Sequence, residues 1–348
     1  MTKQKYILTL FNQNSLKLQI IYDTIGTKEG IYRKTFKLKG ADSKMYAIQM
    51  KNYGDVDVLV DAQVPLPELK PKQVLIKQRA VAIDPYDVGL RAGIKGREKE
   101  PPLIAGSSAA GEIVKLGSKV TEFQLGQRVA ASPHLRTYAE YVAVGQSQLA
   151  LIPQNVTYQQ AAACALGVQT AYQIVYDSLK LVESDRVLIH GGAGSVGFAA
   201  IQFVRQHKVA DIYTTASGLG ADFLRNFDNQ LHVIDYRRED FSKSVPKMDK
   251  IIDTVGGESL KKSLSVLKKD GNLISTVSDN TDPRVKFFFL KSNGKKLEAV
   301  LKQVATGNFY VKIAETAPFN VINLRKFHQA KHVVGKLILN FEEKNDMF

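Results

Sequence analysis

The glycine-rich stretch "RVLIHGGAGSVGFAAIQFVRQH", which runs from Arg186 to His207, limits the fold of this chain more than any other feature. A short apolar run suited to a buried strand comes first, then glycines at G-x-G-x-x-G spacing, then apolar residues at helical spacing. Such a turn lets the backbone approach a pyrophosphate, and the free N–H groups at the start of the helix favour an anion. The other interpretation is a tight turn that binds nothing. The context favours a dinucleotide site made of Gly192, Ala193, Gly194, Ser195, Val196 and Gly197.

Strands and helices alternate along this part of the chain. The residue patterns predict strands at 186–190, 211–215, 231–236, 250–255 and 271–277, and helices at about 195–207, 219–227 and 258–268. Alternation of this kind is typical of an α/β fold with a parallel, doubly wound sheet. Helical periodicity also covers residues 155–180.

The region before residue 155 has a different character. From Met45 onward, short apolar segments such as "KQVLIKQRAVAI" and "AEYVAV" are separated by Gly and Pro, which predicts an irregular β-rich domain. In residues 1–44, the segments "SLKLQIIYD" and "IYRKTFKLKG" alternate as strands around the turn-rich "TIGTKEG". We therefore expect a separate N-terminal extension that forms a β-hairpin.

The end of the second predicted strand indicates which nicotinamide cofactor the chain prefers. NAD-binding units carry Asp or Glu there to accept from the ribose 2′-OH. This chain has "YTTASGLGAD", with Ala216 and Ser217 in that place, so a 2′-phosphate would meet no repulsion. Ser217, Tyr236 and Arg237 supply donors, although the last two are equally well interpreted as ordinary residues after a strand. The pattern favours NADPH over NADH.

Composition excludes several other classes of protein. The formal net charge is +14, and residues 1–44 hold nine Lys and Arg against three Asp and Glu, a net charge of +6. No basic motif is interleaved with aromatic residues, so a solvated surface is favoured over nucleic-acid binding. The single cysteine, Cys164, excludes an internal disulfide framework. No apolar run suits a signal peptide or a membrane span, so a cytoplasmic location is the expectation.

From Met45 to about Phe341 the chain resembles the zinc-independent quinone oxidoreductase branch of the medium-chain dehydrogenase/reductase superfamily, which includes the zeta-crystallins. The resemblance rests on "AIDPYDVGLRAG", "PPLIAGSSAAGEIVKLGSKV", "AAACALGVQTAYQ", "VLIHGGAGSVG", "DTVGGESLKKSLSVLKKDGNLIS" and "GKLIL" in the expected order. It implies a GroES-like β-rich catalytic domain at 45–165 and 295–348, a Rossmann NADPH-binding domain at 166–294, and a homodimer. Residues 1–44 lie outside it.

The zinc-dependent relatives place a Cys where this chain has Asp84, a His-Glu pair at Ser107 and Ser108, and a third ligand near Leu166. These side chains do not provide a tetrahedral site of nitrogen and sulfur ligands, so no metal is expected. Cys164, close to Leu166, is interpreted as a small buried core residue.

Two histidines in "HQAKH", His328 and His332, have metal-compatible i, i+4 spacing on a predicted helix. An adjacent Glu and a third ligand are missing from this motif. We interpret both as surface histidines.

Without a zinc ion to polarise a simple ketone, the substrate must already be electrophilic. A quinone or an enone delocalises the charge that hydride transfer delivers. The resemblance accordingly implies NADPH-dependent reduction of quinones or α,β-unsaturated carbonyls. The alternative is a nucleotide-binding protein without turnover, either crystallin-like or RNA-binding.

The resemblance also implies roles for individual residues. The segment "AIDPYDVGL" lines the cleft beside the nicotinamide in the family, and Tyr86 offers a neutral O–H there. Asp84 and Asp87 are interpreted either as a catalytic proton relay or as Asp-Pro turn and helix-cap residues. Near the nicotinamide ribose and amide, the matching positions are Thr170, Val255 and Gly256. A plain strand-ending turn is the other interpretation of "DTVGG".

Overall fold

The computed structural model describes residues 5–11, 17–25, 31–39, 44–209, 211–277 and 282–342 of the 348-residue chain. The chain divides into two units that each consist of separate segments. The first unit comprises Met1–Ile152, Ala317–His328 and Leu339–Phe348, and the second comprises Pro153–Thr316 and Gln329–Ile338.

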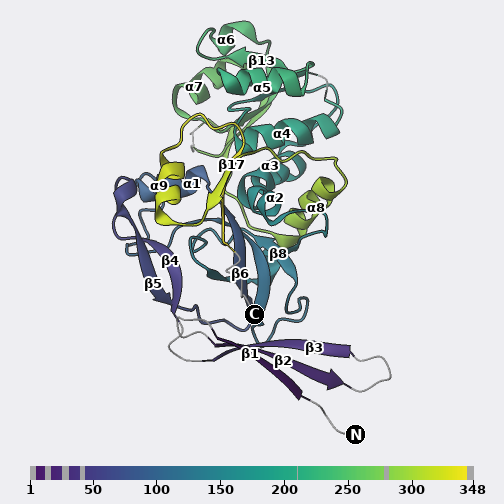
Figure 1. Ribbon diagram of the computed structural model, residues 1–348. Coiled ribbons are helices and arrows are strands. Elements are labelled where there is room, and N and C mark those ends of the chain that lie inside the picture. The colour runs from purple at the N-terminus through teal and green to yellow at the C-terminus, as the bar shows by residue number, and fades with distance from the viewer. Residues whose placement is uncertain are drawn as a thin grey trace. The chain divides into compact units, whose positions relative to one another are not determined.

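The first unit is rich in β-strands, as the short apolar segments predict, and the structure shows antiparallel pairing among them. The seven-stranded sheet has the strand order β10-β8-β7-β6-β18-β17, and β9 also pairs with β6. Figure 1 labels β6, β8 and β17 of this sheet. The strands are β6 (Gln73–Ala82), β7 (Ser108–Leu116), β8 (Arg128–Ala131), β9 (Tyr141–Gly145), β10 (Ala150–Leu151), β17 (Ile313–Pro318) and β18 (Lys336–Asn340). A second, two-stranded sheet pairs β4 (Lys44–Met50) with β5 (Leu59–Pro65).

Short helices connect the strands of the first unit. They are the 3-10 turns η1 (Val56–Val58) and η2 (Gln146–Gln148) and the α-helices α1 (Pro85–Arg91) and α9 (Val321–Gln329). Helix α1 directly follows β6, because a proline at its first position fixes a helical φ angle where no intrahelical N–H bond is needed. This placement brings the segment "DPYD" to the end of a buried strand.

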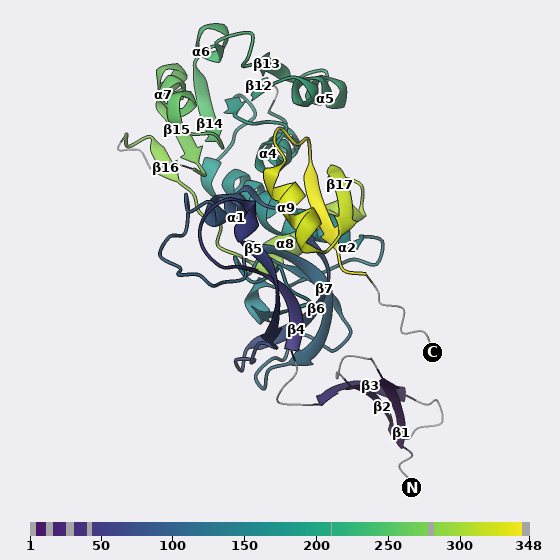
Figure 2. The same cartoon turned by 60° about the vertical axis from the view of Figure 1, so that its left-hand side comes forward.

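The N-terminal residues form a three-stranded antiparallel sheet, β1-β2-β3 (Figure 2). The strands are β1 (Lys5–Phe11), β2 (Lys17–Ile25) and β3 (Ile31–Lys39). The predicted hairpin corresponds to β2 and β3, which pair from Lys17 with Lys39 to Ile25 with Ile31. Strand β1, which was not predicted, adds to the other side of β2.

The second unit contains the predicted doubly wound sheet, with six parallel strands in the order β13-β12-β11-β14-β15-β16. The strands are β11 (Arg186–Ile189), β12 (Asp211–Ala216), β13 (His232–Asp235), β14 (Met248–Asp253), β15 (Leu267–Ser275) and β16 (Val285–Phe287). The helices around it are α4 (Ser195–Gln206), α5 (Leu219–Phe227), α6 (Phe241–Ser244), α7 (Gly257–Val266) and α8 (Gly294–Ala305). The prediction of a parallel α/β sheet is confirmed.

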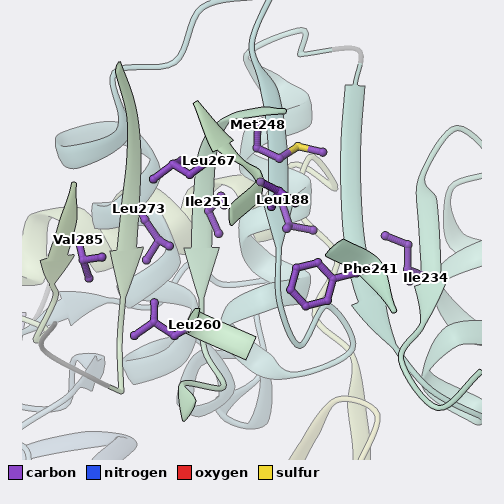
Figure 3. Close-up of a cluster of buried hydrophobic side chains, with 10 residues drawn as sticks. Leu188, Ile234, Phe241, Met248, Ile251, Leu260, Leu267, Leu273 and Val285 are labelled. Atoms are coloured by element: carbon purple, nitrogen blue, oxygen red, sulfur yellow. The ribbon is translucent and has the colours of Figure 1, made fainter. Parts of the chain in front are cut away.

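The hydrophobic core on one side of this sheet joins strand residues to residues of the covering helices. Figure 3 shows Leu188, Ile251 and Leu273 on neighbouring strands, with Phe241 and Leu260 from α6 and α7 packed near them. Strands of a parallel sheet are buried on both faces, which is why they read as nearly continuous apolar runs in the sequence. This packing fixes the strand ends from which the turns of the site project.

One irregular helical segment leads into the second unit. It consists of α2 (Tyr158–Ala163), the π-helical turn η3 (Cys164–Val168), α3 (Gln169–Gln173) and the π-helical turn η4 (Ile174–Leu179). Thr157 and Gln160 form a capping box that starts it. A Cβ atom on Gly167 would lie 2.3 Å from Oγ of Ser195, so only glycine lets this segment approach the start of α4 so closely.

Candidate active site

The glycine turn between β11 and α4 has the geometry of a dinucleotide site. A Cβ atom on Gly192 would lie 2.0 Å from Oγ1 of Thr214, and one on Gly197 would lie 2.3 Å from the carbonyl oxygen of Gly191. Both positions therefore exclude a side chain, because these distances are far shorter than non-bonded contacts allow. Gly194 is the N-cap of α4 and has no side chain to cap the first amides. Those amides remain available to an anion, so the turn fits a pyrophosphate.

The side chain of Ser195 supports the same interpretation. Its Oγ atom is buried and has no hydrogen-bond partner among the described residues. Buried hydroxyl groups normally have a partner, so a hydroxyl without one at the start of α4 is consistent with a ligand there. The contacts of Ala193 and Val196 with a ligand stay predictions.

The ends of β12 and β13 bring together the residues predicted to bind a 2′-phosphate. Ala216 and Asp235 are paired in the sheet, so Ser217 and Tyr236 follow at neighbouring strand ends. The backbone N–H of Tyr236 donates to the carbonyl oxygen of Ala216 (3.2 Å). Arg237 is exposed, and its Nη2 lies 3.4 Å from Nε2 of His332. No carboxylate occupies the last residue of β12, as the sequence indicates.

The turn "DTVGG" at the end of β14 is held by the buried carboxylate of Asp253. Its Oδ1 accepts hydrogen bonds from the backbone N–H groups of Val255 (3.0 Å) and Gly256 (2.9 Å), and its Oδ2 accepts from Ser275 (2.8 Å). These bonds leave the side chain of Val255 exposed at the carboxyl end of the sheet. Sequence reasoning selected the turn but not this carboxylate, which shapes it.

His190, at the end of β11, was also missed. The Oγ of Ser263 donates to the carbonyl oxygen of Ser259 (2.6 Å), so it accepts from Nε2 of His190 (2.8 Å), and Nδ1 of His190 accepts from Thr215 (3.0 Å). Burial lowers the pKa of His190 to about 4. A neutral histidine therefore joins β11, β12 and α7 beneath the glycine turn.

Thr170, predicted near the nicotinamide ribose, lies in α3 and is almost fully buried. Its Oγ1 donates to the carbonyl oxygen of Leu166 (2.8 Å), one turn earlier. The hydroxyl proton is thus used within the helix, and any contact with a cofactor would use the oxygen as an acceptor.

In the first unit, Asp84 and Asp87 form a buried polar cluster with two serines. Oγ of Ser108 donates to Oδ2 of Asp84 (2.5 Å), and Oγ of Ser107 donates to Oδ1 of Asp87 (2.5 Å). All four side chains are completely buried. Asp84 is at the N-cap of α1, but its side chain makes no capping hydrogen bond, so the cap interpretation is wrong for this carboxylate. It turns instead to Ser108.

His328 extends this cluster, and its interpretation as a surface histidine is wrong. The side chain is 3% exposed, and its Nε2 lies 3.0 Å from the hydroxyl of Tyr138, which itself donates to Oδ2 of Asp87 (3.2 Å). Burial, and then the nearby cation of Arg91, lower the pKa of His328 to about 3. His332 lies beyond the end of α9 and is exposed, so the two histidines do not share a helix face.

Tyr138 was not selected from the sequence, where it directly precedes the quoted segment "AEYVAV". Burial raises its pKa well above the ordinary value, and the charges of Asp87 and Asp84 add to this effect. Tyr138 is therefore a neutral donor at any pH near 7.

The described residues contain no group of three or more His, Cys, Asp or Glu side chains that converge as ligands of a metal ion. Cys164 is completely buried, as predicted, and burial raises the pKa of its thiol to about 12. Among the helices that the structure describes, none combines the length and the apolar character needed to cross a membrane.

Comparison with known proteins shows that two successive regions of the chain match family models of dehydrogenases. The family model for the alcohol dehydrogenase GroES-like domain matches residues 70–186, and the model for the zinc-binding dehydrogenase matches residues 230–339. A 2-methylene-furan-3-one reductase of Solanum lycopersicum is 31% identical over 314 residues, which cover 86% of this chain and 79% of the relative. An NADPH-dependent alkenal/one oxidoreductase of Arabidopsis thaliana, described as chloroplastic, is 30% identical over 312 residues, which cover 85% of this chain and 79% of that protein.

A solved structure gives the same result for the fold. The quinone oxidoreductase from Coxiella burnetii superposes with a TM-score of 0.79 at 28% sequence identity. The match covers 86% of this chain and 100% of that protein. The GroES-like and Rossmann folds expected from the sequence are thus confirmed, and the expected domain bounds stay predictions.

Proposed function

Since the chain belongs to the zinc-independent quinone oxidoreductase branch of the medium-chain dehydrogenase/reductase superfamily, we propose that it transfers hydride from NADPH to a quinone or an α,β-unsaturated carbonyl. The observation that carries the cofactor assignment is the uncharged end of β12 beside Arg237. Relatives named as reductases of enones and quinones support the substrate class. These names do not favour the alternative, a protein that binds the nucleotide without turnover.

The residues of the second unit are assigned to the parts of the cofactor. The glycine turn from Gly192 to Gly197 would hold the pyrophosphate at the start of α4. We assign the 2′-phosphate to Ser217, Tyr236 and Arg237, and the nicotinamide end to Thr170, Val255 and Gly256. When bound, the cofactor supplies a hydride, and these residues bind and orient it.

In the first unit we propose Tyr86 as the donor that protonates the reduced substrate. Asp84 and Asp87 are assigned the positioning of α1, in which Tyr86 lies, because serine hydroxyls already occupy their carboxylates. A proton relay through the two carboxylates is the second role. It predicts that Asp84→Asn lowers kcat, whereas the positioning role predicts a lower melting temperature.

The experiment that tests the proposed function follows the loss of NADPH absorbance with an ortho-quinone and, separately, with a conjugated enone. NADH in parallel measures cofactor preference. We expect turnover with at least one acceptor and a higher kcat/KM with NADPH. Tight NADPH binding without turnover of either acceptor would instead support the binding protein.

We also propose that the protein is a homodimer. Strand β16 is at one edge of the six-stranded sheet as described; Phe287, its last residue, and Phe289, two residues further on, are each 51% exposed. An exposed edge with aromatic side chains is suited to pairing with a second copy. Light scattering should give a mass twice that of one chain, and Phe287→Lys should lower the measured mass toward that of a monomer. Tyr310→Lys, at another exposed aromatic, is the control.

A cytoplasmic location is the last part of the proposal. One cysteine in 348 residues suits a reducing compartment. Fractionation of cells that express the full chain tests this location, and recovery in an organelle fraction would contradict it.

A further inference from the structure

Residues 332–336, in the last segment of the second unit, run along the proposed cofactor site. A Cβ atom on Gly220, in the first turn of α5, would lie 3.8 Å from Cγ2 of Val334. Two residues further on, Lys336 lines the same small pocket as Ser195, the first residue of α4. The segment therefore passes beside the first turns of both helices that follow the assigned phosphate-binding turns.

The backbone of this segment is fixed at its end and strained at its start. The N–H of Lys336 donates to the carbonyl oxygen of Lys312 (2.9 Å). Gly335 has a φ of 103°, and a Cβ atom there would lie 2.5 Å from the same carbonyl oxygen, so only glycine allows this approach. His332 has a left-handed φ of 54°, which is uncommon for a residue with a side chain and is often found at ligand sites.

The side chain of His332 meets that of Arg237. Nε2 of His332 lies 3.4 Å from Nη2 of Arg237, and both residues are exposed. A guanidinium has only donors, so Nε2 of the imidazole is the acceptor in this contact.

No carboxylate balances the charge of Arg237 in the part of the chain that the structure describes. The carboxylate of Asp235 has other partners: its Oδ1 accepts from the backbone N–H of Arg237 (3.1 Å), and its Oδ2 lies 3.6 Å from Nε of Arg238. The guanidinium and the imidazole therefore form a pair of nitrogen groups that an anion would complete.

We propose that His332 is a specificity-determining residue that donates, together with Arg237, to the 2′-phosphate of NADPH. This inference rests on the proposed function. When the phosphate is present, Nε2 of His332 becomes a donor, with a proton moved from Nδ1 or taken up from water. Ser217 and Tyr236 offer donors from the ends of β12 and β13, and His332 adds one from the returning segment. NADH has no phosphate at this place, so His332 contributes nothing to its binding.

The variants H332N and H332Q test this role by the reach of their amide groups. Asparagine tolerates a left-handed φ, but its amide nitrogen reaches only the position of Nδ1 in the imidazole. The amide of glutamine reaches the position of Nε2. H232N is the matched control, because His232 is exposed at the first residue of β13, the end of that strand opposite to the site.

Calorimetric titration with 2′,5′-ADP and 5′-ADP, and with NADPH and NADH, measures the effect without turnover. We expect H332N to weaken binding of 2′,5′-ADP and NADPH by about fivefold or more, because a charge-assisted hydrogen bond is lost from an exposed site. The dissociation constants of 5′-ADP and NADH should stay within about twofold of wild type. H332Q should recover most of the affinity, and H232N should bind all four ligands like wild type.

The double variant R237A/H332N separates a direct contact with the phosphate from an effect through Arg237. If His332 contacts the phosphate itself, H332N weakens 2′,5′-ADP binding in the R237A background as well. A second readout is the 31P resonance of the 2′-phosphate in bound 2′,5′-ADP, which should shift in H332N and not in H232N.

The outcomes distinguish the two proposals. If the wild type binds 2′,5′-ADP no more tightly than 5′-ADP, the NADPH assignment in the proposed function fails and this inference falls with it. If the wild type prefers 2′,5′-ADP and H332N equals H232N, only the role of His332 is overturned. The same holds if H332N has no further effect in the R237A background.

Discussion

The hydroxyl of Tyr138 lies 3.0 Å from Nε2 of His328 and joins this histidine to the carboxylate of Asp87. Because Tyr138 donates its proton to Asp87, its oxygen accepts from Nε2–H of His328. The other ring nitrogen, Nδ1, is buried and has no hydrogen-bond partner among the described residues. The arrangement requires a neutral histidine.

This requirement predicts how stability depends on pH. The pKa values of His328 (about 3) and His190 (about 4) in the folded protein lie below the ordinary value of 6.5. Below pH 6.5 the unfolded chain therefore binds protons that the folded chain does not. The free energy of unfolding should fall by about 1.4 kcal/mol per pH unit for each histidine as the pH decreases from 6 to 5.

Urea unfolding at pH 7, 6 and 5 measures this slope, in a range where the carboxylates with lowered pKa values stay ionised. In His328→Gln, the slope of the free energy of unfolding against pH should decrease by the contribution of one proton, whatever the substitution does to stability at pH 7. An unchanged slope would show that His328 is not neutral and buried.

Removal of the Tyr138 hydroxyl should destabilise the first unit. Tyr138→Phe keeps the ring but deletes the bond to Asp87 and the acceptor of His328, which we expect to cost about 1–3 kcal/mol. Tyr310→Phe, at an exposed tyrosine, provides the comparison. Equal melting temperatures for the two variants would contradict the assigned hydrogen bonds.

The glycines of the turn should differ in the kind of damage that an alanine causes. Gly197→Ala places a Cβ 2.3 Å from a backbone oxygen and should lower the melting temperature, because the backbone has to move. Gly194→Ala approaches the nearest atom only to 3.2 Å, so it should fold but bind NADPH more weakly. Calorimetry of unfolding and of NADPH binding measures both effects. Wild-type affinity of folded Gly194→Ala would argue against the pyrophosphate site.

Arg237 should select between the two cofactors. Arg237→Ala is expected to weaken NADPH binding by about tenfold or more, with little change for NADH, which has no 2′-phosphate. Arg238→Ala is the matched control, because that side chain is directed to Asp235 at 3.6 Å. Similar losses for both cofactors would place Arg237 outside the phosphate subsite.

The sequence predicted the second unit well because periodicity and composition are local properties. The predicted strand 186–190 and helix 195–207 differ from β11 and α4 by one residue each at their ends. The start of β15 was missed, since "LKKDG" has no apolar alternation and Leu267 pairs with Met248 before a register shift. The start of β15 depends on its pairing with β14, and no local sequence pattern encodes this pairing.

The candidate site was only partly accessible from the sequence for the same reason. The motifs identify Gly192, Arg237 and Tyr86, which lie in short recognisable segments. His328 was misjudged because its partner Tyr138 is 190 residues away, and its burial depends on packing that spacing does not encode.

The order in which the chain visits its two units has a consequence for its synthesis. Residues 329–338 return to the second unit, where the N–H of Lys336 bonds to the carbonyl oxygen of Lys312, and the chain then leaves to complete β18 between β6 and β17. Once α8 has been synthesised, all strands of the six-stranded sheet are present, but β17 and β18 are not. The sheet that contains β6 must wait for these two strands, so shorter nascent chains will expose an unpaired sheet edge to chaperones and proteases.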